Sequence, residues 1–396
     1  MTDTELRDGL RTYIQALKRE YFAADPRPWS PERAVTTELV PDHRNGETVN
    51  RLFVILCGPG CWYALSDDGP CNNCGFLDVT THGAPVSAAQ YVGQLERALM
   101  DYDLERQNIR ELDLYNAGSF FCDEEIDATS REALMGRIAG LPSVEHVLVD
   151  CHVRDVDAEK IRRARRALGD KTLELGIGLE SADEFIRNVC INKGTDLDDF
   201  ERAARVIRDA GARLAVYLLF KPAFLSEDEA IRDAIRTLHY VFDLAETIEV
   251  PIRVSVEPAV IQGISLLPHL HSRGMYTPPW LWSIVEVLRA TAHRGEIRVG
   301  VPEEEPTIQA RPQNYRDDGA QACACSGEVM RTVARYNELR DPTILESLPA
   351  CECRSVWQRV RDAEHPPLPR RVEEFLANGA RGRAPGLTGP RSPDAG

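Results

Sequence analysis

The stretch RLFVILCGPGCWYALSDDGPCNNC, residues 51–74, joins an apolar run to a loop that holds three cysteines. The run RLFVILC has the continuous apolar character of a strand that is covered on both faces, as strands of parallel sheets are. The loop is rich in glycine, proline, aspartate and asparagine, and it contains Cys61, Cys71 and Cys74. We therefore predict a buried strand that delivers a cysteine-bearing loop at its carboxyl end.

Short apolar runs recur along the chain and alternate with longer patterns of helical period, which is typical of βα units around a parallel sheet. Because no G-x-G-x-x-G follows the first strand, a dinucleotide-binding doubly wound sheet is disfavoured. The sequence predicts an α/β fold with a partial or six-unit (β/α) barrel. The expected strands span residues 51–57, 110–116, 146–151, 173–179, 214–220 and 253–257, with a further candidate at 297–301.

The changes in sequence rhythm divide the chain into four segments. Residues 1–50 form an N-terminal helical extension whose helix spans about residues 1–24. Residues 51–301 form the barrel core, and residues 302–378 form a C-terminal segment with two C-x-C pairs. Residues 379–396 hold no core-forming side chains, and we expect a disordered tail there.

Composition narrows the classes of function. The formal net charge of −16 argues against general nucleic-acid binding. A local basic groove or a partner subunit could still supply affinity for nucleic acid. No apolar run approaches the roughly 18 residues that a membrane span needs. The acidic N-terminus lacks the apolar region of a secretory signal, so we expect a cytoplasmic protein. Thiols stay reduced there, and clustered cysteines are then metal ligands or catalysts rather than disulfides.

The three cysteines of the loop are one fewer than a closed metal site needs. A structural zinc ion takes four protein ligands, and so does a four-iron cluster that only the protein holds. Zinc with Cys57 as the fourth ligand is an alternative, but Cys57 ends an apolar strand, where a buried small hydrophobe is expected. Active sites of (β/α) barrels lie at the carboxyl ends of the strands, which is where this loop falls.

Further motifs lie near the ends of the expected strands. They are NAGSFFCDEE (116–125), GIGLESADEFIRNVCINKG (176–194), YLLFKPAFLSEDEAI (217–231), VSVEPAVIQGISLLPHL (254–270) and MYTPPWLWSIVEVLR (275–289). With the C-x9-C-x2-C loop, they make the chain resemble the radical S-adenosylmethionine (radical SAM) enzymes of the Elongator-like branch. It resembles in particular the radical SAM subunit family of archaeosine synthase, over most of residues 50–295.

This resemblance implies a [4Fe-4S] cluster held by Cys61, Cys71 and Cys74, with SAM bound at the fourth iron. Reductive cleavage of SAM would then give methionine and a 5′-deoxyadenosyl radical that abstracts hydrogen from the substrate. The protein's part would be to position the substrate and exclude water. The residues that the resemblance implies as SAM contacts follow the second and fourth strands and are Asn116, Gly118, Ser119, Glu180 and Ser181.

Four further polar residues are candidates. Asn192 and Lys193 could bind a carboxylate or phosphate of the cofactor, or could cap the next helix. Lys221 and Glu257 fall at carboxyl ends of strands, where they could act on or orient a polar substrate, or pair with each other.

The C-terminal segment contains a second group of cysteines, Cys323, Cys325, Cys351 and Cys353. Four thiolates are enough for a structural zinc site or an auxiliary iron–sulfur cluster, and unliganded thiols are the remaining alternative. A metal here would tie this small segment together.

The resemblance implies carbon–nitrogen bond cleavage, a lyase reaction, on a lysine-modified deazaguanine of tRNA. The acidic charge suggests either that a partner subunit supplies RNA affinity or that the substrate is a small-molecule analogue, and we favour the latter slightly. A one-electron reductant such as flavodoxin or ferredoxin would be a further partner. A hypothesis of another class is a zinc-stabilised scaffold protein without radical chemistry.

Overall fold

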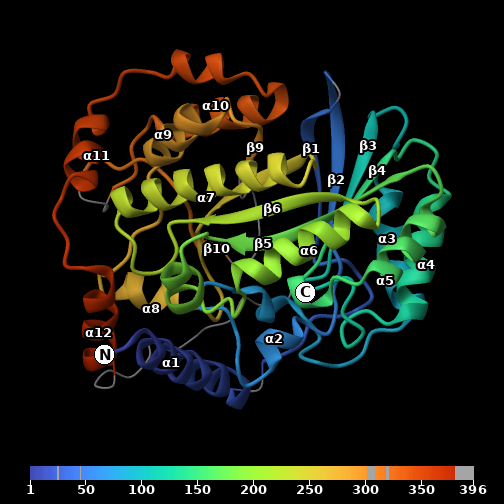
Figure 1. Ribbon diagram of the computed structural model, residues 1–396, viewed down its shortest axis with the longest axis horizontal. Helices are drawn as coiled ribbons and strands as arrows, with labels where there is room; N and C mark the ends of the chain where they lie inside the picture. Colours follow the sequence, from blue (N-terminus) through green and yellow to red (C-terminus); the bar gives the residue numbers. More distant parts are fainter. Residues whose placement is uncertain (25, 45, 301–307, 318–320, 380–396) are drawn as a thin grey trace.

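The computed structural model describes residues 1–396 except 25, 45, 301–307, 318–320 and 380–396. Its main sheet has eight strands in the order β1-β2-β3-β4-β5-β6-β7-β9 (Figure 1). Strand β1 is antiparallel to β2, and from β2 to β9 each strand is parallel to its neighbour. The strands are β1 (Thr36–Arg44), β2 (Glu47–Ile55), β3 (Ile109–Tyr115), β4 (His146–Asp150), β5 (Thr172–Glu180), β6 (Arg213–Phe220), β7 (Ile252–Pro258), β8 (Ile261–Gln262), β9 (Glu296–Val299) and β10 (Ile308–Ala310).

Helices α3 to α6 pack side by side outside the sheet, and α7 lies along β6 and β7 (Figure 1). The α-helices are α1 (Asp3–Ala23), α2 (Trp62–Leu65), α3 (Ala88–Met100), α4 (Ala128–Ala139), α5 (Ala158–Leu168), α6 (Leu197–Asp209), α7 (Glu227–Thr247), α8 (Leu266–Ser272), α9 (Leu281–Thr291), α10 (Ser326–Leu339), α11 (Cys353–Arg361) and α12 (Leu368–Gly379). Short 3-10 or π turns are η1 (Phe76–Val79), η2 (Val153–Asp155), η3 (Ile186–Cys190) and η4 (Pro342–Ser347).

The sheet is strongly curled, as ion pairs between distant strands show. Strands β3 and β7 are four steps apart, which is about 19 Å in a flat sheet. Nevertheless Arg253 Nη2 on β7 lies 2.9 Å from Glu111 Oε1 on β3. Arg298 Nη1 on β9 lies 3.7 Å from Asp42 Oδ2 on β1, although these strands are opposite edges of the sheet. The predicted partial barrel is therefore confirmed.

Each predicted strand of the core is present, and β1 is an additional strand that the sequence pattern does not predict. This strand contains Pro41, which lacks the N–H that a central strand needs, and charged side chains near its end. Proline is accepted at a sheet edge, and β1 is an edge strand. The N-terminal segment is thus a helix followed by an edge strand. The last residue of the further strand candidate, and the tail at 380–396, lie outside the described residues.

Charged side chains fill the amino-terminal end of the concave face. Glu174 Oε2 lies 2.8 Å from His146 Nε2 and 2.5 Å from Arg253 Nη2, and Arg44 pairs with Glu111. Glu111, His146 and Glu174 have the ligand types of a metal site and lie within 4.8 Å of one another. The two arginines already supply the positive charge there, so we interpret this group as an ionic core rather than a metal site.

Helix α10 bridges the two edges of the open sheet, packing against both β1 and β9. The Asn337 amide accepts from Val299 N at 3.0 Å and donates to Val299 O at 2.7 Å, which satisfies the free edge of β9. Arg340, which follows α10, pairs with Asp42 on β1, with Nη2 2.5 Å from Oδ1. Edge groups that would invite pairing with another chain are thereby covered.

Helices α1 and α12 lie side by side across the carboxyl ends of the strands (Figure 1). The rings of Tyr13 and Phe375 meet edge to face at 5.0 Å between centroids, and a Cβ on Gly9 would touch Leu376. The N-terminal extension is thus packed onto the C-terminal segment. Within the described ranges, none of the helices combines the length and apolar character that a bilayer crossing requires.

Candidate functional site

The loop after β2 places its three cysteines around a common space. Cys61 precedes α2, Cys71 and Cys74 close the loop, and all three are partly buried. Burial raises the pKa of Cys61 and Cys71 to about 12 and that of Cys74 to about 11. Each thiol also raises the pKa of one of the others. Cys71 acts on Cys61, Cys74 acts on Cys71, and Cys61 acts on Cys74. Positive charge close to the three sulfurs therefore favours their thiolate forms.

The three thiols suit a group larger than one metal ion. Zinc–sulfur bonds of about 2.3 Å bring the thiolates of one ion to within about 4 Å of each other. At least one of the distances between the sulfurs of Cys61, Cys71 and Cys74 exceeds 4.8 Å. Cys57 is fully buried, and its backbone N–H and C=O are both bonded to the Gln94 amide. The donor set fits a multi-iron cluster with three protein ligands.

Asparagine side chains join the cysteine loop to the segments that follow β5 and β6. Asn72 donates to Val189 O at 3.1 Å, and Asn73 accepts from Ala223 N at 3.0 Å. Asn192 donates to the carbonyl oxygens of Asp68 and Pro70 at 2.9 and 3.0 Å. The candidate Asn192 is therefore a clamp on the loop in this structure, and its side-chain oxygen has no hydrogen-bond partner among the described residues.

Glu180 and Lys193 form an ion pair at the mouth of the barrel, with Nζ 2.8 Å from Oε1. Burial disfavours the ammonium of Lys193, but Glu180 and Cys71 raise its pKa. Lys193 in turn lowers the pKa of Cys71 and Cys74 against the larger effect of burial. A Cβ on Gly178 would lie 2.2 Å from Glu180 Oε1 and 2.4 Å from Lys193 Nζ. The glycine of the GLES motif thus makes room for a cation–carboxylate pair beside the cysteines.

Glu125, which was not among the predicted site residues, connects the cysteine loop to the NAGS motif. Its carboxylate accepts from Trp62 N at 2.9 Å, from Asn116 Nδ2 at 3.0 Å and from Ser119 N at 2.5 Å. A Cβ on Gly118 would lie 1.9 Å from Glu125 Oε2. Burial raises the pKa of Glu125 to about 7. The sequence contains this residue in a family-like stretch, but nothing in it distinguishes Glu125 from the neighbouring Glu124.

The remaining candidates, Ser181, Lys221 and Glu257, have different partners in the structure. Ser181 is buried and donates to Asp233 Oδ1 of α7 at 2.7 Å. Lys221 pairs with Glu227 at 2.5 Å and donates to Thr277 O at 2.9 Å, so it does not pair with Glu257.

Glu257 instead accepts from Ser255 Oγ at 2.5 Å on the concave face. Near it lies Asp150, where burial raises the pKa and Glu257 raises it further. Asp150 Oδ1 has no hydrogen-bond partner among the described residues. No pattern in the sequence singles out Asp150, because it has the place of the last residue of an ordinary strand.

Several residues at the strand ends have left-handed backbone without being glycine. They are Ala117 (φ +54°), Glu180 (φ +68°), Asn192 (φ +58°) and Lys221 (φ +58°). Such conformations cost about 1–3 kcal/mol each and persist where the surroundings impose them. They lie at or after the ends of β3, β5 and β6, at the mouth that also receives the cysteine loop, so strained residues occur where function is expected.

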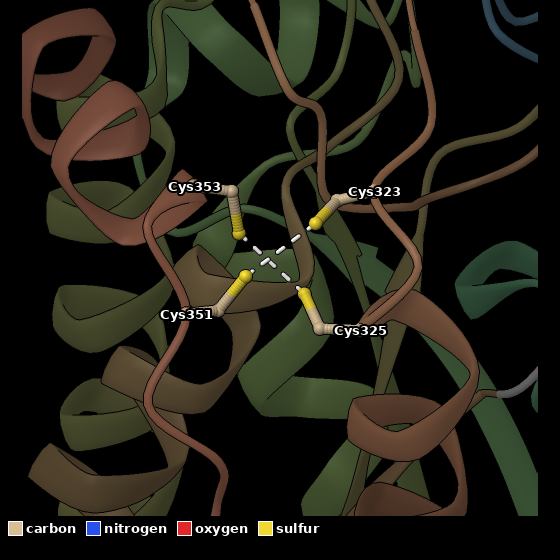
Figure 2. Close-up of side chains that lie close together, drawn as sticks. All are labelled: Cys323, Cys325, Cys351 and Cys353. Atoms are coloured by element: carbon tan, nitrogen blue, oxygen red, sulfur yellow. Dashed lines mark hydrogen bonds between the residues drawn. The ribbon is translucent and has the colours of Figure 1, made fainter.

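The four C-terminal cysteines converge on one point (Figure 2). Cys323 and Cys351 have their sulfurs 3.5 Å apart, as do Cys325 and Cys353, and all four lie within 4.8 Å of one another. Tetrahedral zinc requires sulfur separations of about 3.8 Å, whereas a four-iron cluster places each thiolate on a different iron and spreads them further. The spacing therefore fits a single ion better than an auxiliary cluster.

Neighbouring side chains donate to these sulfurs. Trp282 Nε1 lies 3.2 Å from Cys353 Sγ, and Asn314 Nδ2 lies 3.4 Å from Cys325 Sγ. Hydrogen bonds of this kind orient thiolate ligands and temper their charge. The group joins the start of α10 to the start of α11, with α9 contributing the indole.

The chain is similar in sequence to two relatives of the same name, although no protein-family model matches it. Archaeosine synthase subunit beta of Methanosarcina acetivorans is 30% identical over 349 residues, which cover 87% of this chain and 94% of that protein. Archaeosine synthase subunit beta of Thermococcus kodakarensis is 27% identical over 327 residues, covering 81% and 94%. Among solved structures, methylornithine synthase (PylB) shares 14% identity over 97% of this chain and 94% of its own, with a TM-score of 0.45.

A curled, open, parallel sheet whose first parallel strand delivers a three-cysteine loop is the architecture of the radical SAM proteins, and this chain is one of them. Within that class, the identity and coverage place the chain in the archaeosine synthase subunit beta family.

Proposed function

We propose that the chain is a radical SAM enzyme of the carbon–nitrogen lyase type that acts on a lysine-modified deazaguanine. The observation that carries the proposal is the set of three interacting thiols, Cys61, Cys71 and Cys74, in the loop after β2 of a chain of this family. Cys61, Cys71 and Cys74 would hold a [4Fe-4S] cluster. When bound, the cluster and SAM supply one-electron cleavage of SAM to methionine and a 5′-deoxyadenosyl radical, which takes hydrogen from the substrate.

The residues of this chain would fix the positions of the reacting groups. Glu125 bonds to both the cysteine loop and Asn116 and Ser119, and would hold the two walls of the proposed SAM site together. The Glu180–Lys193 pair sets the local charge beside the thiols and offers polar atoms to the amino acid or ribose part of SAM. Binding and orientation of this kind are the protein's share of cofactor chemistry.

Glu257 and Asp150 are the acidic groups proposed to contact the substrate from the concave face. Burial raises the pKa of Asp150, which favours the protonated form of this carboxyl, the form that can donate a hydrogen bond. Lys221 would act indirectly, because its ammonium is held by Glu227 and Thr277. We assign it a positioning role for the loop after β6.

The relatives' names shift our preference for the substrate. Both are called archaeosine synthase subunit beta, which supports a modified nucleoside of tRNA over a small-molecule analogue and supports a partner subunit. The electron donor would be a flavodoxin or ferredoxin, and the reaction would take place in the cytoplasm. These assignments are proposals that follow from the family.

The proposal is tested by anaerobic reconstitution with iron and sulfide. We expect about four irons per chain at the loop, loss of this iron when Cys61, Cys71 or Cys74 becomes Ala, and retention in the Cys57→Ala control. With SAM and dithionite, the reconstituted protein should form 5′-deoxyadenosine. A colourless protein that binds only zinc, and whose loop variants behave like the control, would support the scaffold hypothesis instead.

We further propose that Cys323, Cys325, Cys351 and Cys353 hold one structural zinc ion, because their sulfurs converge within 4.8 Å of one another. Metal analysis should find about one zinc per chain, absent from Cys325→Ser and kept in Cys61→Ala. Iron that disappears with Cys325→Ser, in place of zinc, would establish an auxiliary cluster.

A further inference from the structure

A cavity of about 650 Å³ lies beside the cysteine loop. Its walls come from α1, from α2 of the loop, from η2 after β4 and from α6. Trp62, the residue after Cys61, forms part of the lining, as does Gly194, the residue after Lys193. The volume is in the range of sites that take a nucleotide-sized ligand.

Four buried polar atoms that belong to this lining have no hydrogen-bond partner within the described chain. They are Arg7 Nε, Arg11 Nε, Trp62 Nε1 and His152 Nε2. The first three are always donors. His152 Nδ1 accepts from Arg154 N at 3.4 Å, and burial lowers the His152 pKa to about 3, so the neutral ring carries its proton on Nε2. All four orphaned groups are donors, and buried donors without acceptors are costly.

The charge of the lining also favours an acceptor ligand. Arg11 lies 3.1 Å from Asp68, and Arg202 pairs with Asp199 on the same helix. These pairs leave Arg7, which has no ion pair in the described chain, and Arg154, whose contact with Asp155 is 3.5 Å. Asp196 is the acidic group that remains in the lining. The lining thus holds four arginines against three aspartates, an excess of one positive charge among these residues, within a protein of net charge −16.

Aromatic rings form one side of the same cavity. The rings of Tyr63 and His152 stack at 6.3 Å between centroids, and Trp62 meets His152 edge to face. The Arg154 guanidinium lies over the Trp62 ring. Arginine and aromatic planes of this kind are the surfaces on which unpaired bases stack.

From these observations we propose that this cavity binds an unpaired nucleotide of the RNA substrate, with its phosphate on Arg7 and Arg154 and its base against the Trp62–Tyr63–His152 cluster. This inference rests on the proposed function, because it takes RNA as the substrate. It assigns to the chain itself an RNA contact that its overall charge does not suggest. Trp62 and Tyr63 belong to the cysteine loop, but no cysteine lines the cavity, so RNA affinity should not require the cluster.

The test measures binding of an unmodified tRNA transcript and of a single-stranded oligoribonucleotide to the full chain, with and without reconstituted iron. We expect the Arg7→Gln/Arg154→Gln variant to bind both RNAs about ten-fold more weakly and to show a shallower salt dependence, by about 0.7 for each phosphate that it no longer binds. The matched control is Arg19→Gln/Arg163→Gln, which makes the same charge change on exposed faces of α1 and α5. Circular dichroism and iron content verify that the variants fold.

Equal RNA affinity of the two double variants would overturn the proposal, as would RNA binding that appears only when a partner protein is added. Either result leaves the radical SAM assignment standing, because that rests on iron content and 5′-deoxyadenosine formation. Conversely, iron-free chain that binds RNA through Arg7 and Arg154 supports the site even if SAM cleavage fails.

Discussion

At the scale of single residues, two glycines owe their place to the missing Cβ rather than to unusual backbone angles. Gly118 lies against Glu125 and Gly178 lies against the Glu180–Lys193 pair, and neither has a positive φ. Both sites are where polar side chains approach the backbone at the mouth of the barrel. The glycines of the NAGS and GLES motifs therefore leave room for the carboxylates of Glu125 and Glu180.

Substituting Gly178→Ala should damage the site more than the fold. The new methyl group would overlap Glu180 Oε1 and Lys193 Nζ, which must move apart, at a cost of about 1–3 kcal/mol. We expect weaker SAM binding and less iron after reconstitution, measured by calorimetry and metal analysis.

The matched control is Gly136→Ala on α4, where a Cβ meets nothing within 4 Å. There we expect a small gain in stability, up to about 1 kcal/mol. If Gly178→Ala binds iron and SAM like the control, the ion pair has no part in the site.

At the scale of elements, helix α10 substitutes for the strand that would close the barrel. Asn337 presents an amide to the edge of β9, and Arg340 holds β1 from the end of the same helix. One helix therefore contacts both edges of the sheet.

Replacing Asn337 by Ala should remove the partners of Val299 N and Val299 O together. Two buried backbone groups lose their hydrogen bonds, so we expect the free energy of unfolding to fall by about 2–4 kcal/mol. Urea denaturation measures this. The exposed Arg335→Ala on the same helix should change it little, and equal effects of both substitutions would contradict the role of Asn337.

At the scale of the whole molecule, an ionic core fixes the curl of the sheet. Arg253 joins Glu111 on β3 and Glu174 on β5 across the concave face. Burial favours the protonated form of Glu174, but Arg253 and His146 together lower its pKa to about 2. A carboxylate with a lowered folded pKa stabilises the fold above its unfolded pKa of about 4.5, and this stability is lost as the pH falls towards 2.

The Glu174→Gln variant should accordingly be less stable than the wild type at pH 7, by about 3 kcal/mol, because Arg253 loses a buried partner. The difference should shrink as the pH is lowered from 5 to 2. Unfolding curves at several pH values check this, with the exposed Glu159→Gln as a control that matches the wild type. A difference that does not depend on pH would rule out the ionised Glu174 as its cause.

The parallel strands and the curled sheet could be predicted from the sequence because buried apolar runs and helical patterns are local signals. The four C-terminal cysteines, which Figure 2 shows converging, could also be grouped in advance. Strand β1 could not, because its proline and charges are allowed only by its place at the edge. Nor could the pairing of Lys221 with Glu227 or the role of Glu125, because those contacts depend on how loops from separate strands meet.

The position of the four-thiol site has a consequence for handling the protein. Cys325 immediately precedes α10, the helix whose other end holds β1 and β9 together. The four thiols therefore fix one end of α10, and α10 itself joins the two edges of the open barrel. Aerobic purification that oxidises these thiols or removes a metal from them would let β1 and β9 separate while the interior of the barrel stays folded. Such a preparation would lose hydrogen-exchange protection first at the Val299 amide.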